Sequence, residues 1–164
     1  MARILANSGA TRLEAEQLFK DAVTLAPNDF ALAQERAANL LAAGDTINAA
    51  LEYRQAFEIS PQSRWALKAY VAQVWRLGAV PVAIKQHAKT LAKEPNDITA
   101  RLLLAELLRS EARHHDALEQ YNIVLRRDPT NAIARLRHCR DNARAQFLIA
   151  LKMLLNLPLK DPAN

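Results

Sequence analysis

Four prolines recur at a constant interval, and this register constrains the fold more than any other feature of the chain. The prolines are Pro27, Pro61, Pro95 and Pro129, so that each stands thirty-four positions after the one before. An alanine precedes each proline by the same distance, at Ala15, Ala49, Ala83 and Ala117, and a ring follows each alanine four residues later, at Phe19, Tyr53, His87 and Tyr121. Such a register indicates an internal repeat, in which each unit packs mainly on its neighbours.

The residues between the prolines favour helices. The chain has only 3 glycines and is 51% hydrophobic, which leaves little material for hairpin turns, β-bulges or phosphate-binding loops. A polar pair able to cap a helix follows each proline. We therefore predict helices over residues 11–25, 30–43, 47–59, 64–77, 81–93, 98–111, 115–127, 132–144 and 147–157.

The alanine, ring and proline columns resemble those of the tetratricopeptide repeat family, whose repeat has the same period. The resemblance implies an all-α fold, a right-handed α-α superhelix of helical hairpins. It divides the chain into a partial repeat (1–29), three repeats (30–63, 64–97 and 98–131) and a degenerate terminal unit (132–164). In such a unit small residues let the two helices approach closely, the ring fills the gap to the next unit, and the proline ends the second helix.

Both ends of the chain depart from a complete array. Residues 1–8 are too short for a first helix, so we interpret the chain as a segment of a longer repeat protein. Residues 147–157 are apolar nearly all round, whereas a capping helix carries a polar outer face. We therefore expect a further repeat, a second copy of the chain or the last groove to cover this helix, and self-association is one expected result.

No motif of a known catalytic or phosphate-binding site occurs, so we predict a non-enzymatic protein without a cofactor. We expect no metal site, because His114, His115 and Asp116 are neighbours that diverge on a helix. The single cysteine, Cys139, shares a column with Ala37 and Ala105, and we expect it to be a small buried residue. With no disulfide, secretory signal or membrane span in the sequence, we predict a cytoplasmic protein.

Charge is divided unevenly along the chain. Residues 1–82 hold 8 basic and 8 acidic side chains, whereas residues 83–164 hold 14 basic and 9 acidic ones, which accounts for the whole net charge of +5. In the tetratricopeptide family the first helix of each pair lines a concave groove that holds peptides. By resemblance, those columns contain Trp65, Lys68, Trp75, Arg76, Leu102, Glu106, Arg109, Arg140 and Arg144. Tryptophan and arginine are the residues most often found at interface hot spots.

The leading hypothesis is therefore a protein–protein interaction scaffold that holds an acidic peptide in its concave groove. A structural solenoid that spaces or assembles other domains is one alternative, and a regulatory domain of a larger enzyme is another. Nucleic-acid binding is the weakest interpretation, because the basic half lacks an arginine-rich or glycine-rich tract.

Overall fold

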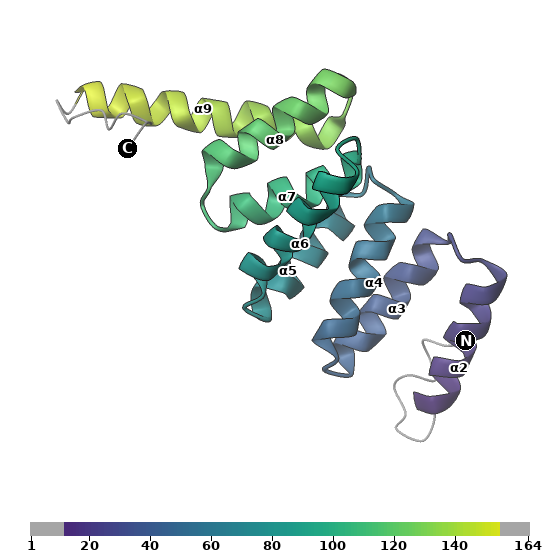
Figure 1. The fold of residues 1–164 in the computed structure, drawn as a ribbon. Coiled ribbons are helices and arrows are strands. Elements are labelled where there is room, and N and C mark those ends of the chain that lie inside the picture. Colours follow the sequence, from purple (N-terminus) through teal and green to yellow (C-terminus); the bar gives the residue numbers. More distant parts are fainter. Residues whose placement is uncertain (1–11, 155–164) are drawn as a thin grey trace.

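A computed structural model describes residues 12–154 of the chain. Within this range the chain forms helices and no strand, so the predicted all-α fold is confirmed. The helices are α2 (Arg12–Leu25), α3 (Phe30–Ala42), α4 (Thr46–Ile59), α5 (Arg64–Arg76), α6 (Val80–Lys93), α7 (Ile98–Ser110), α8 (His114–Arg127) and α9 (Ala132–Leu154). They follow one another through space in sequence order, so that α2 and α9 lie at opposite ends of the array (Figure 1).

The start of each first helix is fixed by a capping side chain that recurs with the period of the prolines. Asp29, Ser63 and Asp97 each accept a hydrogen bond from a backbone N–H in the first turn of α3, α5 and α7. Asn131 does the same for α9, with its Oδ1 3.1 Å from the amide nitrogen of Ala134. These residues satisfy N–H groups that a helix leaves without an internal partner, which confirms the capping role predicted for the pairs after the prolines.

The turns inside the hairpins also repeat. Gly44 and Gly78 have positive φ angles of 80° and 63°, and Ala112, at the equivalent position of the next repeat, has a φ of 59°. Each amide here bonds back to the preceding helix, as from Gly44 to the carbonyl of Leu41 and from Ala112 to that of Arg109. Glycine adopts this left-handed conformation without steric cost, whereas alanine is strained in it.

The predicted columns form the core of the array. Ala49 and Ala117 are fully buried, as are Ala37 and Ala105 on the facing first helices. The ring column is buried as well, with the fractional exposures of Phe19, Tyr53, His87 and Tyr121 at 6% or less. Small side chains therefore lie where paired helices approach most closely, and rings fill the space between one pair and the next.

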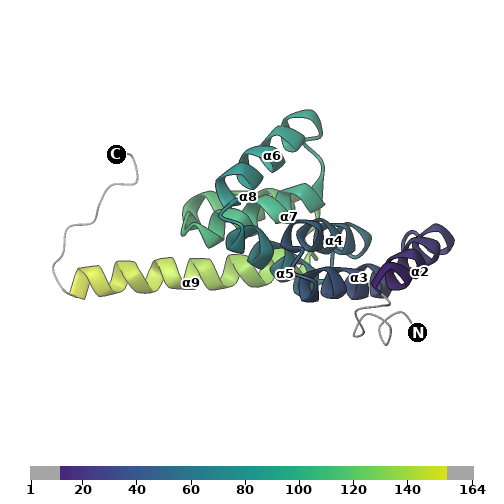
Figure 2. The same cartoon turned by 90° about the horizontal axis from the view of Figure 1, so that it is seen from below.

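One pair is more open than the others. Helix α6 contacts α7 more extensively than its own partner α5, and it diverges from α5 in Figure 2. Val71 of α5 occupies the column that holds Ala37 and Ala105 elsewhere. Its side chain is larger than the alanines that stand in this column of the two pairs that pack more closely.

The prediction of two helices over 132–144 and 147–157 is wrong. Residues Ala132–Leu154 form one continuous helix, α9, which projects beyond the rest of the array (Figures 1 and 2). The turn position of the earlier hairpins is occupied here by Gln146, between good helix formers and without glycine or proline nearby. In residues 12–154, no helix combines the length and apolar character needed to cross a membrane.

Candidate functional site

Helix α5 carries the largest set of predicted groove residues on a single exposed face. Trp65, Lys68, Trp75 and Arg76 are all exposed, and Ala72 lies exposed between the two tryptophans. Ten residues separate the tryptophans, which corresponds to about 15 Å along a helix. The exposed face of α5 therefore has one large ring at each end, Trp65 and Trp75, and the small side chain of Ala72 between them.

The two tryptophans differ in how they are held. The Trp65 ring packs edge-on against Tyr53 of α4, with ring centroids 5.3 Å apart and an interplanar angle of 79°. Its exposed fraction is 45%, while that of Trp75 is 65%. Trp65 is thus a partly fixed platform, and Trp75 offers most of its surface to a partner.

The charge of this face is uniform. Helix α5 contains three basic residues and no acidic one. Lys68 and Arg76 form no ion pair with any described residue, and neither does Arg64, which is also exposed at the start of the helix. Arg64 was missed from the sequence because it occupies the first position of the unit, outside the groove columns carried over by resemblance.

Leu102 and Glu106 do not line an open groove, and that prediction is wrong for both. Leu102 has no exposed surface, and 3% of Glu106 is exposed. Helix α7 lies against α5, α6 and α8 and is buried nearly all round from Leu102 to Leu108. A helix packed on several sides buries columns that a first helix with one open face would expose.

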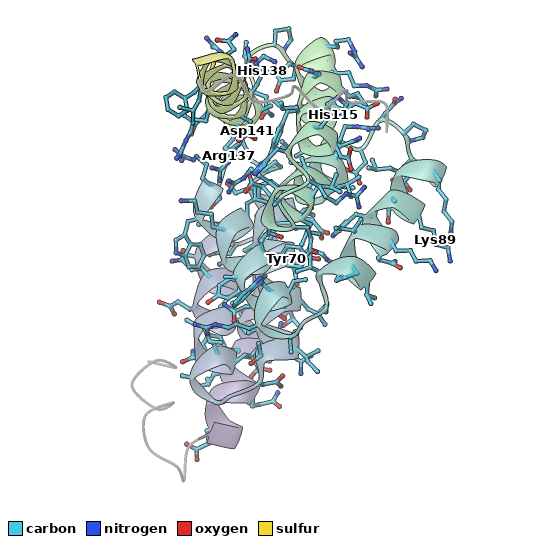
Figure 3. The ribbon with its side chains drawn as sticks, turned by 90° about the vertical axis from the view of Figure 1, so that its left-hand side faces the viewer. Tyr70, Lys89, His115, Arg137, His138 and Asp141 are labelled. Carbon is cyan, nitrogen blue, oxygen red and sulfur yellow. The ribbon has the colours of Figure 1, made fainter. Side chains whose placement is uncertain are left out.

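Glu106 is the centre of a buried polar network between α7, α8 and α9. Its Oε2 lies 3.1 Å from Nη2 of Arg137, and its Oε1 accepts hydrogen bonds from Nε of Arg137 and from the Tyr121 hydroxyl, which is 2.7 Å away. Figure 3 shows Arg137 and Asp141 on the side of α9 that faces the other helices, with His138 on another side. Burial and the Glu106 carboxylate raise the pKa of Tyr121, so its proton stays on the hydroxyl.

Arg109 belongs partly to this network. Its Nη2 lies 3.3 Å from Oε2 of Glu106, and its side chain is 32% exposed. Burial lowers its pKa, but the Glu106 carboxylate outweighs this effect and raises the pKa overall. Arg109 therefore already has a partner within the chain, the Glu106 carboxylate.

The remaining predicted arginines lie on α9. Arg140 is exposed and has no ion-pair partner among the described residues, whereas Arg144 lies further along the same helix. Arg137 was not predicted, although an acidic and a basic residue about one repeat apart on successive first helices is a signal that could have found it.

Cys139 is exposed, so the prediction that it is a buried small residue is wrong. The residues in its column, Ala37 and Ala105, are fully buried, because a second helix covers them. Helix α9 continues straight past the turn position, and no such helix from the described part of the chain lies over Cys139. Within residues 12–154, no group of three or more histidine, cysteine or carboxylate side chains gathers as a set of metal ligands.

Comparison with family models and with curated proteins found no match. Two solved structures resemble the fold. An Arabidopsis OM64 TPR domain is 16% identical, with a TM-score of 0.45, covering 70% of this chain and 95% of that one. A structure titled MamA RS-1 ArsTM double mutant is 18% identical, with a TM-score of 0.48, covering 88% of this chain and 83% of that one.

The fold is nevertheless of the tetratricopeptide type on the evidence of the chain itself. The helical hairpins, the capping residues and the buried small and ring columns all recur with the period that the prolines mark in the sequence. This establishes a helical repeat array, with the exposed face of α5 as its candidate binding surface.

Proposed function

We propose that the chain is a protein-interaction scaffold that holds an acidic peptide against the exposed face of α5. The observation that carries the proposal is the pair of exposed tryptophans, Trp65 and Trp75, on a helix with three basic and no acidic residues. Trp75 in particular leaves 65% of its surface in water. Large aromatic rings flanked by unpaired cations are the usual anchors of a protein interface.

The two kinds of side chain contribute differently. Covering a tryptophan that is about half exposed removes on the order of 100 Å² of mainly apolar surface from water, worth roughly 2–3 kcal/mol. Lys68 and Arg76 add attraction for carboxylates and steer the approach of an acidic segment more than they add affinity. Arg140 and Arg144 of α9 add further positive charge in this proposal, while the bonds from Arg137 to Glu106 link α9 to α7.

The proposed boundaries of the repeats follow the period of the four prolines. We assign the three repeats to residues 30–63, 64–97 and 98–131, with a partial unit over 1–29 and a terminal unit over 132–164. The α5 face then belongs to the middle of the three repeats.

The proposal is tested by screening acidic and neutral peptides for binding and measuring the affinity of the best one by titration calorimetry. Trp75→Ala should weaken binding by about 1–3 kcal/mol, and Lys68→Glu should mainly slow association at low ionic strength. Lys89→Glu is the matched control, since Lys89 is exposed on α6, away from α5 (Figure 3). Equal effects of Lys68→Glu and Lys89→Glu, or no loss with Trp75→Ala, would refute the assignment to α5.

A further inference from the structure

Helix α9 exposes a face whose equivalent is buried in the earlier first helices. In the other units the equivalents of Cys139 include Ala37 and Ala105, which are fully buried under a second helix. Cys139 itself is exposed, and so is Arg135, whose equivalents are the buried Ala33 and Leu67 and the half-buried Arg101. In the earlier units a second helix packs on this side of the first helix. No described residue packs in this way on the exposed side of α9.

The apolar part of this side continues along the projecting half of α9. Phe147 is 65% exposed and Leu151 is 39% exposed, and with Arg140 they fall on one stripe at helical spacing. We define the open face of α9 as Arg135, Cys139, Arg140, Ala143, Phe147 and Leu151, all of them exposed. Contiguous exposed apolar surface is a common mark of an interaction site.

The opposite end of the array carries a stripe of the complementary kind. Glu14, Leu18, Asp21 and Leu25 of α2 follow one another at intervals of four, three and four residues, so they lie on one face of the helix. All four are exposed, Leu18 by 41% and Leu25 by 87%. We call this set the acidic stripe of α2.

The charges of the open face of α9 and the acidic stripe of α2 favour contact between these two surfaces. Helix α9 contains five basic residues and one acidic residue, Asp141, which is buried. On the acidic stripe of α2, the two charged residues are Glu14 and Asp21. Two copies of α9 would bring like charges together, and so would two copies of α2, whereas α2 against α9 joins opposite charges and covers apolar side chains on both helices.

We propose that the acidic stripe of α2 in one copy of this chain docks on the open face of α9 in another copy. Glu14 to Leu25 covers about 16 Å of helix and Arg135 to Leu151 about 24 Å, so the acidic stripe fits within the length of the open face. α2 then takes the place of a second helix, which residues 12–154 of the same copy do not supply over this face. The contact joins different surfaces of the two copies, so it propagates head to tail and forms chains of molecules. It does not involve the α5 face and shares only Arg140 with the surface proposed for peptide binding.

The test is sedimentation velocity on the full chain over a range of protein concentration and ionic strength. The average mass should rise with concentration and fall with salt. Arg135→Glu with Arg140→Glu should lower the association constant by about tenfold or more, and Glu14→Lys with Asp21→Lys should do the same. Lys89→Glu, an exposed charge reversal on α6, is the control that should leave the association unchanged. Circular dichroism checks that each variant is folded.

An equimolar mixture of the two double variants supplies the decisive arm. Each variant repels itself at the proposed contact, but the reversed α9 of one is complementary to the reversed α2 of the other, so the mixture should associate again. A wild-type chain that stays monomeric at every concentration would overturn the proposal. So would an α2 double variant that associates like the wild type, or a mixture that fails to recover.

Cross-linking separates head-to-tail contact from a symmetric pair. Cys139 is the chain's single cysteine. With Leu18→Cys added, oxidation should produce a ladder of dimers, trimers and longer species, because each copy then has a thiol on both contacting surfaces. A wild-type chain that forms a disulfide dimer through Cys139 in high yield would show that two α9 helices face each other, and would contradict the proposal.

Discussion

A buried histidine makes the stability of the array depend on pH between 6.5 and about 4. His87 of α6 is 6% exposed, and its Nε2 lies 3.0 Å from the Tyr70 hydroxyl of α5. Burial and, to a smaller extent, the charge of Arg54 lower the pKa of His87 from 6.5 to about 4, although Asp97 opposes the shift. The imidazole is therefore neutral in the folded chain at neutral pH and bridges two helices that otherwise contact each other little.

The sign and size of the effect follow from this difference in pKa. The unfolded chain takes up a proton on His87 below pH 6.5, whereas the folded chain resists until about pH 4, so stability is lost as pH falls through this window. A fall in pKa from 6.5 to about 4 corresponds to roughly 3 kcal/mol in total, of which about 2 kcal/mol is lost between pH 7 and pH 5.

The assay is urea denaturation at pH 7 and at pH 5 for the wild type and for His87→Phe. The variant keeps a ring but cannot titrate, so its unfolding free energy should fall by about 2 kcal/mol less than that of the wild type over this interval. At pH 7 the variant should be the less stable of the two, because the buried Tyr70 hydroxyl loses its partner.

His115→Phe provides the matched control, because the His115 side chain is 89% exposed. Its loss of stability between pH 7 and pH 5 should equal that of the wild type. If the wild type and His87→Phe lose the same free energy over this interval, or if His87 titrates near 6.5 by NMR in the folded chain, the reasoning is refuted.

Three further changes test the fold by thermal and chemical denaturation. Glu106→Gln should cost about 3–5 kcal/mol because it leaves the Arg137 guanidinium buried without a counter-charge, whereas Glu58→Gln, which affects an exposed pair, should cost less than about 1 kcal/mol. Ala112→Gly should stabilise the chain by about 0.5–1 kcal/mol by relieving the φ of 59°, and an unchanged or lower midpoint would contradict the strain. Ala117→Trp should destabilise by about 1–3 kcal/mol or more, since no space exists at a fully buried alanine between paired helices, and an unchanged melting temperature would show that the column is misplaced.

The spacing of the prolines and alanines was sufficient to predict the helical hairpins, because the residues that begin and end each helix bond to the backbone of the same helix. Ser63 and Asp97 cap helices through bonds to their own first turns, and Gly44 and Gly78 end helices through their own backbone. Ala112 adopts the same turn without glycine, with a φ of 59°, and this turn was still predicted from the repeat spacing.

The candidate site was predicted less well, because burial depends on which helices surround a residue. Trp65 and Trp75 are exposed as expected, but Glu106, in the same column as the exposed Ala72, is buried beneath neighbouring helices and bound to Arg137. Likewise, Cys139 repeats the column of buried alanines but is exposed, because the chain did not turn at Gln146. A column reports a position within a unit, and only the packing of whole units determines what covers it.

The intrinsic fluorescence of the chain tests the central proposal most directly, because Trp65 and Trp75 are its two tryptophans and both lie on α5. In the free chain, Trp75 should emit at long wavelength, as expected for a ring that is 65% exposed. Titration with a bound acidic peptide should shift the emission to shorter wavelength and protect it from an aqueous quencher, and Trp75→Phe should remove most of the shift. A peptide that binds with measurable affinity while emission and quenching stay unchanged would place the binding surface elsewhere and contradict the account.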